Sequence, residues 1–82
     1  MQKIRLDIGQ NIQACRKAAG MTQDAAVAKM NLMGLSITKS TYAKIETNRI
    51  NIWVSELAAL AKIFNVEIGD FFKKVLPSPK TT

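Results

Sequence analysis

The 82-residue sequence predicts one compact all-α domain built from five short helices. Apolar residues recur at spacings of three and four in five successive stretches, and each stretch is followed by a Gly, Asn or Pro that favours the end of a helix. Hydrophobic residues make up 48% of the chain and charged residues 22%, a balance typical of a globular domain. We expect this domain to cover residues 1–76 and residues 77–82 to form a flexible tail, because the prolines at 77 and 79 cannot extend a helix.

The first expected helix carries an apolar stripe formed by Ile8, Ile12, Cys15 and Ala19. Gly20 follows the stripe, and a glycine in this position commonly ends a helix in the left-handed conformation. Met21 is then placed to fold back onto Cys15, the apolar contact that often accompanies such an end. The sequence therefore predicts a helix that stops just before Gly20.

The second expected helix begins after Thr22, whose hydroxyl can accept a hydrogen bond from a free N–H group of the first turn. Its inward stripe consists of Ala26, Met30 and Met33, and Gly34 is expected to end it near Met33. The segment 31–37 is largely apolar, so we expect it to pack against the core.

The third expected helix runs from Lys39 to about Thr47, and it follows Thr38, a residue type that is preferred at the cap of a helix start. Tyr42 and Ile45 face inward in this arrangement, which leaves a short, polar and basic outer face. Asn48 follows, and asparagine tolerates the positive φ value that ends a helix. A loop is therefore expected at residues 48–51.

The fourth expected helix is marked by a stripe of Trp53, Leu57, Leu60 and Phe64. Asn65 and Val66 repeat the pattern of a helix end. A short fifth helix is indicated by Ile68, Phe71, Phe72 and Val75. Because Phe71 and Phe72 are adjacent, their directions differ by about 100°, and both cannot point fully into one small core.

The charge distribution favours a polyanionic partner. The formal net charge is +6, and residues 29–51 hold four basic side chains against the single acid Glu46. Residues 56–72 have the opposite balance, with three acids and one lysine. The basic excess therefore lies in the middle of the chain and at its ends.

The residue types present argue against several other classes of protein. Cys15 is the only cysteine and histidine is absent, so the chain alone offers neither a disulfide nor a Cys/His metal site. The commonest general base is also missing, so we expect no enzymatic activity, no metal and no cofactor. The first seven residues lack the long apolar segment of a secretory signal, and we expect a cytoplasmic protein with no membrane association.

The order of these features resembles the Cro and phage-repressor type of helix-turn-helix protein, the Xre-like family. The resemblance covers Ile8 to about Phe72 and rests on four pieces of sequence: Ile8-Gly9 with Ile12 and Arg16, Gly20-Met21-Thr22-Gln23, Ser40-Thr41-Tyr42-Ala43-Lys44-Ile45-Glu46, and Leu60-Ala61-Lys62-Ile63-Phe64-Asn65-Val66. It implies a five-helix lambda-repressor-like domain that acts as a sequence-specific regulator of transcription on double-stranded DNA, most often a repressor. The third helix would lie in the major groove.

The resemblance also assigns roles to individual residues. Candidates for reading bases on the third helix are Lys39, Ser40 and Lys44, with methyl contacts from Thr41 and Ala43. Candidates for binding phosphates are Thr22 and Gln23 at the start of the second helix and Thr47, Asn48, Arg49 and Asn51 after the third. Arg16 and Glu46 occupy the positions of a partly buried ion pair with a structural role.

The sequence departs from the family pattern at the link between the second and third helices. About five extra residues lie around 31–37, and they make the angle of the third helix harder to predict. The family usually binds as two-fold dimers, so we expect a homodimer, with Phe71 or Phe72 and Val75 or Leu76 at its interface.

Two other functions stay open at this point. The chain could serve as a protein-interaction or antitoxin-like regulatory module that uses its apolar carboxyl end, with DNA binding secondary. An RNA-binding role is less compatible with the sequence, because Tyr42 and Trp53 are both expected to face inward and leave no stacking platform.

Overall fold

The computed structural model describes residues 8–73 and contains four α-helices followed by one 3₁₀ helix. Their order is α1 (Ile8–Ala18), α2 (Gln23–Leu32), α3 (Lys39–Glu46), α4 (Val54–Phe64) and η1 (Ile68–Phe72). The prediction of an all-α domain is confirmed, and the count of five α-helices is wrong, because the fifth element is a 3₁₀ helix. Its backbone bond from Asp70 N–H to Glu67 O spans three residues, as expected in this tighter helix. Val75, Leu76 and the predicted tail 77–82 lie outside the described residues.

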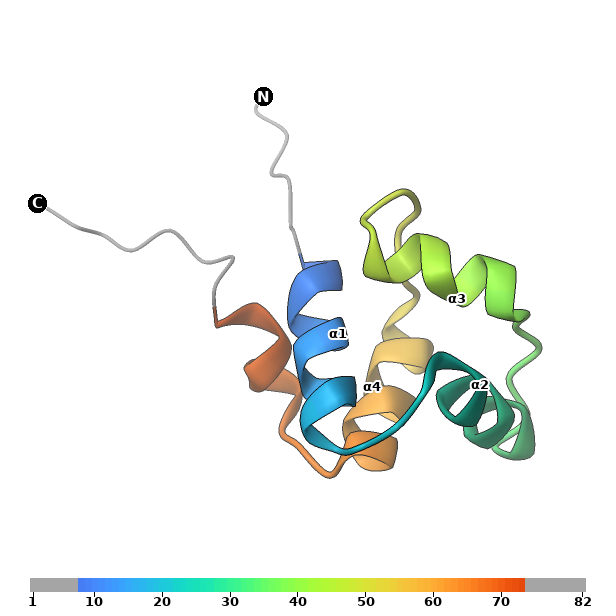
Figure 1. The fold of residues 1–82 in the computed structure, drawn as a ribbon, viewed down its shortest axis with the longest axis horizontal. Helices are drawn as coiled ribbons and strands as arrows, with labels where there is room; N and C mark the ends of the chain where they lie inside the picture. Colours follow the sequence, from blue (N-terminus) through green and yellow to red (C-terminus); the bar gives the residue numbers. More distant parts are fainter. Residues whose placement is uncertain (1–7, 74–82) are drawn as a thin grey trace, which may run out of the picture.

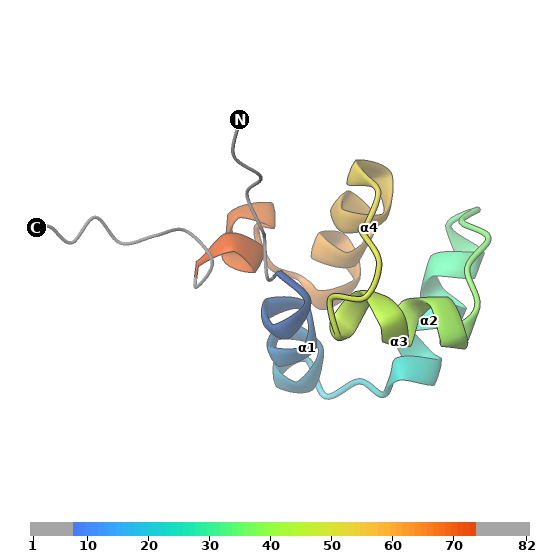
Figure 2. The same cartoon turned by 90° about the horizontal axis from the view of Figure 1, so that it is seen from above.

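The helices surround one shared core. Figure 1 shows α3 lying above α2 and α4, with α1 beside them and η1 against the outer side of α1. The view from above in Figure 2 shows α3 crossing α2. The largest fully buried side chains come from all five elements: Tyr42, Phe71, Ile12, Met30 and Leu60. The side chains of Tyr42 and Ile45 are buried in this core, and they fix the position of α3.

The predicted ends of the first four helices are confirmed. Positive φ values occur at Gly20, Gly34, Asn48 and Asn65, each just beyond the end of a helix. At the end of α2, Leu35 N–H donates to Met30 O and Gly34 N–H donates to Asn31 O. These two bonds satisfy carbonyl groups that have no partner within the helix.

Three residues of the predicted apolar stripes are exposed: Ala19, which lies just beyond the last residue of α1, and Trp53 and Met33. Trp53 is 74% exposed, because it is the residue before α4 and has an extended backbone, so the helical spacing that placed it on the inner stripe does not apply to it. Met33 is 48% exposed, because it lies beyond the last residue of α2 and the chain reverses at Gly34.

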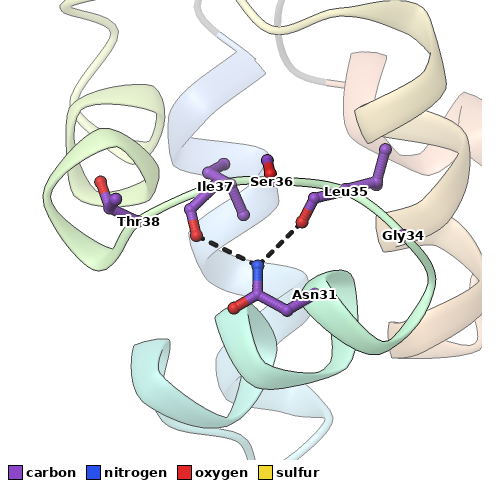
Figure 3. A pocket seen from close by; sticks show the side chains of 6 residues that line it. All are labelled: Asn31, Gly34, Leu35, Ser36, Ile37 and Thr38. Atoms are coloured by element: carbon purple, nitrogen blue, oxygen red, sulfur yellow. Dashed lines mark hydrogen bonds between the residues drawn. The ribbon is translucent and has the colours of Figure 1, made fainter.

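The segment 31–37 is only partly packed. Ile37 is buried and Leu35 packs against the core, as predicted, whereas Leu32 is 86% exposed. Asn31 holds the segment together, since its Nδ2 donates to Leu35 O at 2.8 Å and to Ile37 O at 3.1 Å (Figure 3). The extra residues thus form a closed turn that is bonded to the end of α2. They leave the outer face of α3 exposed to solvent.

Candidate nucleic-acid interface

The start of α3 is fixed by a side-chain cap. Thr38 has an extended backbone, and its Oγ1 accepts from Thr41 N–H at 3.1 Å, as the sequence predicts. The hydroxyls of Thr38 and Thr41 also lie 3.1 Å apart in a hydrogen bond, so Thr41 is half-buried and engaged within the helix start. Thr22 caps α2 in the same way, with its Oγ1 accepting from Ala25 N–H at 3.1 Å.

The inner and outer faces of α3 are clearly separated. Tyr42, Ile45 and Glu46 are buried, whereas Lys39, Ser40 and Lys44 are exposed and Ala43 is half-buried. Neither lysine is turned into the interior, and the turn at 34–38 lies to one side of the helix (Figure 1). The three residues predicted to read bases therefore share one solvent-facing surface.

The inner face is anchored by a buried ion pair between α1 and α3. Arg16 Nε donates to Glu46 Oε2 at 2.7 Å, and Arg16 Nη2 donates to Glu46 Oε1 at 3.1 Å. Arg16 Nη1 donates to Met21 O at 2.9 Å, which ties the link before α2 to the same pair. This two-bond geometry is the strong form of an arginine–carboxylate contact. The pair joins α1 to the end of α3, at the two positions where the family resemblance led us to expect it.

Glu46 also receives bonds from two glutamines. Gln23 Nε2 donates to Glu46 Oε1 at 3.0 Å, and Gln13 Nε2 lies 3.4 Å from the same oxygen. Burial alone raises the pKa of Glu46, but the hydrogen bonds from Arg16 and Gln23 and the arginine charge outweigh it and lower the pKa below its ordinary value. Glu46 is therefore held as a carboxylate that links α1, α2 and α3.

Tyr42 lies one helical turn before Glu46, and its hydroxyl is buried with no hydrogen-bond partner within residues 8–73. Burial raises the pKa of Tyr42, and the neighbouring carboxylate of Glu46 adds to the rise. Tyr42 thus stays neutral, and its ring fills the space beneath α3.

The loop after α3 presents the remaining candidates. Thr47, Arg49 and Asn51 are exposed, and Arg49 N–H donates to Lys44 O at 2.8 Å, which fixes the start of the loop against the helix. Thr47 Oγ1 donates to Ala43 O at 3.1 Å, and its backbone N–H donates to the same oxygen at 3.2 Å, which ties this residue to the end of α3. Arg49 is thereby positioned beside the outer face of α3.

Two of the predicted phosphate-binding residues have structural contacts that the sequence did not reveal. Gln23 is half-buried and bound to Glu46, as described above. Asn48 Oδ1 accepts from Gly9 N–H at 2.9 Å, a contact across 39 residues of sequence that satisfies a free N–H group in the first turn of α1. Both side chains therefore help to hold the helices that frame the surface.

Gly9 allows this close contact. A Cβ atom on Gly9 would lie 2.6 Å from Glu46 O and 2.8 Å from Asn48 Oδ1, and still closer to Ile45 O. The first turn of α1 is therefore pressed against the backbone at the end of α3, which only glycine permits. The resemblance included Gly9, but its spatial reason appears only in the structure.

Asp24 is a residue of this surface that sequence reasoning did not single out as functional. Its Oδ1 lies 3.3 Å from Lys39 Nζ, and its Oδ2 lies 3.4 Å from the same nitrogen. The two residues are 15 apart in sequence, so the only available signal was the placement of an acid in the first turn of α2 and a lysine in the first turn of α3.

Phe71 and Phe72, which were both candidates for the interface between two copies, differ in their burial. Phe71 is fully buried within the chain, so its side chain is not available to a second copy. Its carbonyl accepts from Asn11 Nδ2 at 2.8 Å in a buried contact that fastens η1 to α1. Phe72 is half-buried against the core, and Ile68 on the same short helix is 39% exposed.

Comparison with known proteins identifies the family of this chain. The family model described as helix-turn-helix matches residues 12–71, which is well over half of the chain. The chain has no match among the curated proteins, and none among the solved structures. No helix within residues 8–73 has the length and apolar character needed to cross a bilayer. Given the match and the exposed α3 set across a fixed core, the chain belongs to the Cro/C1-type, Xre-like helix-turn-helix family, whose members are DNA-binding regulators.

Proposed function

We propose that this protein is a sequence-specific transcriptional regulator of double-stranded DNA, acting as a repressor, and that α3 enters the major groove. The observation that carries the proposal is the division of α3 into a buried inner face and an outer face with Lys39, Ser40 and Lys44 exposed. Lysine can donate to the O6 and N7 acceptors of guanine, and serine can donate or accept. Ala43 and Thr41 lie beside them and supply methyl groups for a thymine contact.

The flanking residues support a phosphate-binding frame around α3. The first turn of α2 presents backbone N–H groups beside Thr22 and Gln23, and the loop after α3 presents Arg49 and Asn51. Helix starts attract phosphate through these N–H groups and the positive end of the helix dipole. In this arrangement the exposed side chains of Arg49 and Asn51 contact phosphates, with Thr47 beside them, and Asn48 positions the loop by accepting from Gly9 N–H. The proposal places the protein in the cytoplasm, with its target DNA.

Selection of bound duplexes from a random pool tests this function. We expect one recurring sequence made of two related half-sites, and we expect binding to it to survive an excess of unrelated competitor DNA. Binding should weaken with added salt, with log affinity falling against log salt by about 0.9 for each phosphate contacted. Recovery of no preferred sequence, or an affinity that does not change with salt, would contradict the proposal.

A second function has a specific observation in its favour. Trp53 and Val54, adjacent at the start of α4, are 74% and 77% exposed, and neighbouring exposed apolar side chains are typical of protein contacts. A regulatory or antitoxin-like module that binds a protein partner would use such a surface, with DNA binding secondary. Salt-independent binding of a protein in the absence of DNA affinity would favour this function over the first.

A further inference from the structure

The ion pair between Asp24 and Lys39 lies on the surface that we propose faces DNA. It joins the first turn of α2 to the first residue of α3, with Nζ to carboxylate oxygen distances of 3.3 and 3.4 Å. The Lys39 side chain is 57% exposed and the Asp24 side chain 73%. A pair as exposed as this contributes little to folding. Its position therefore needs an explanation other than stability.

The two residues at the start of α2 contact opposite ends of α3. Gln23 bonds to Glu46, the last residue of α3, and Asp24 pairs with Lys39, the first. The contact with Glu46 is partly buried on the inner side of α3, whereas the contact with Lys39 is at the surface. Asp24 is thus the acidic side chain that faces the same solvent as the base-reading candidates.

We infer that Asp24 is a specificity-determining residue: it restrains Lys39 and repels phosphate, so that it weakens binding to arbitrary DNA more than binding to the preferred sequence. This inference rests on the proposed function. An ammonium group has three N–H donors, so Lys39 can keep one on Asp24 while it offers another to a guanine acceptor. A phosphate that approaches Lys39 is different from guanine, because it carries a full negative charge. The nearby carboxylate of Asp24 repels that charge.

Lys44 offers a natural comparison on the same helix. It is exposed like Lys39, and it makes no ion pair within residues 8–73. Lys44 is therefore free to follow the phosphates of any duplex, whereas Lys39 is not. The two lysines should consequently make different contributions to binding that does not depend on sequence.

The first experiment compares Asp24→Asn with Glu67→Gln. Both variants add one unit of positive charge, and Glu67 is the exposed residue directly before η1, an element that Figure 1 shows on the opposite side of α1 from α3. Binding is measured over a series of salt concentrations on two duplexes: the one selected by the wild-type protein, and one of equal length and composition with a scrambled sequence. Thermal melting of both variants serves to show that each is folded.

Asp24→Asn should tighten binding to the scrambled duplex more than to the selected one. The ratio of the two affinities should fall by about five- to tenfold, the scale of one well-made base contact. The salt slope on the scrambled duplex should rise by about 0.9, because Lys39 gains a phosphate. Glu67→Gln should leave the ratio unchanged. Equal shifts by the two variants would overturn the inference.

The second experiment needs no change at Asp24. On the scrambled duplex, Lys44→Gln should lower the salt slope by about 0.9, and Lys39→Gln should leave it nearly unchanged. Equal losses from the two lysines would show that Lys39 binds phosphate freely and would overturn the inference. A wild-type protein with no preferred duplex would contradict the proposed function itself, whereas a wild-type preference combined with either negative result would contradict only the role of Asp24.

Discussion

At the scale of single residues, Glu46 is the position on which most of the structure depends. Its carboxylate binds Arg16 through two hydrogen bonds and also accepts from Gln23, so that one side chain joins α1, α2 and α3. Removing one partner of a buried pair leaves the other charge without compensation. Lys39, by contrast, pairs with Asp24 in solvent, where an ion pair has little effect on folding.

We therefore expect Glu46→Ala to lower the free energy of unfolding by about 3–5 kcal/mol. Lys39→Ala should lower it by no more than about 1 kcal/mol. Urea denaturation followed by circular dichroism measures both values. Equal losses from the two variants would show that the buried pair has no special role.

The depressed pKa of Glu46 also gives stability a defined dependence on pH. A carboxyl group whose pKa is lower in the folded state stabilises that state above its unfolded pKa, and this contribution is lost as the pH falls through the folded value. The stability of the wild-type protein should therefore decline below about pH 4.3, the ordinary pKa of a glutamate. Glu46→Gln should be less stable at neutral pH and should lose less on acidification. A difference between the two proteins that does not change with pH would contradict this prediction.

Gly9 gives a third prediction at this scale. A methyl group there would overlap the backbone at the end of α3, so Gly9→Ala should destabilise the fold by at least about 1–3 kcal/mol. Gly69→Ala is a matched control, because a Cβ at Gly69 would meet nothing within 4 Å. Melting temperatures of the two variants provide the comparison, and similar values would count against the close contact between α1 and α3.

At the scale of elements, the helix ends could be predicted from the sequence better than the burial of residues near them. Thr22 and Thr38 cap their helices as predicted, and Gly34 and Asn48 have the positive φ values that the sequence led us to expect. These features depend on the chemistry of a few adjacent residues. Periodicity failed at Trp53 because it assumes that the helix continues through the position in question.

Other features could not be predicted because they join residues that are distant in sequence. The bond from Asn11 to Phe71 O spans 60 residues, and the contact of Asn48 with Gly9 spans 39. The arginine–glutamate pair, which spans 30, was recognised only through resemblance to a family. Of the candidate surface, the outer residues of α3 followed from helical spacing, whereas the pairing of Asp24 with Lys39 required coordinates.

The turn between α2 and α3 should depend on the side chain of Asn31. Asn31 supplies two hydrogen bonds to carbonyl groups of the turn, each worth about 0.5–1.5 kcal/mol. Asn31→Ala should therefore lower stability by about 1–3 kcal/mol and increase hydrogen exchange of the backbone at residues 34–38. Ser36→Ala, an exposed change in the same turn, should have little effect. Identical exchange in the two variants would show that Asn31 does not hold the turn.

At the scale of the whole molecule, the small outer face of α3 limits how many bases one copy can contact. We therefore keep the prediction of a homodimer on DNA, with Phe72 and Ile68 in place of the buried Phe71 among the described residues. Sedimentation should detect two protein chains on a duplex with half-sites about one turn apart, 10–10.5 base pairs from centre to centre. A duplex with a single half-site should hold one chain more weakly. A single chain on both duplexes would contradict the homodimer.

The separation of the two faces of α3 has a consequence for how such a protein can change its target. Tyr42, Ile45 and Glu46 are committed to the interior, while Ser40, Ala43 and Lys44 bear none of the interhelical bonds that hold the helix in place. New side chains can therefore be introduced at these three positions without refitting the interior. A set of variants randomised there would retain a common scaffold and differ in the DNA that each one recognises.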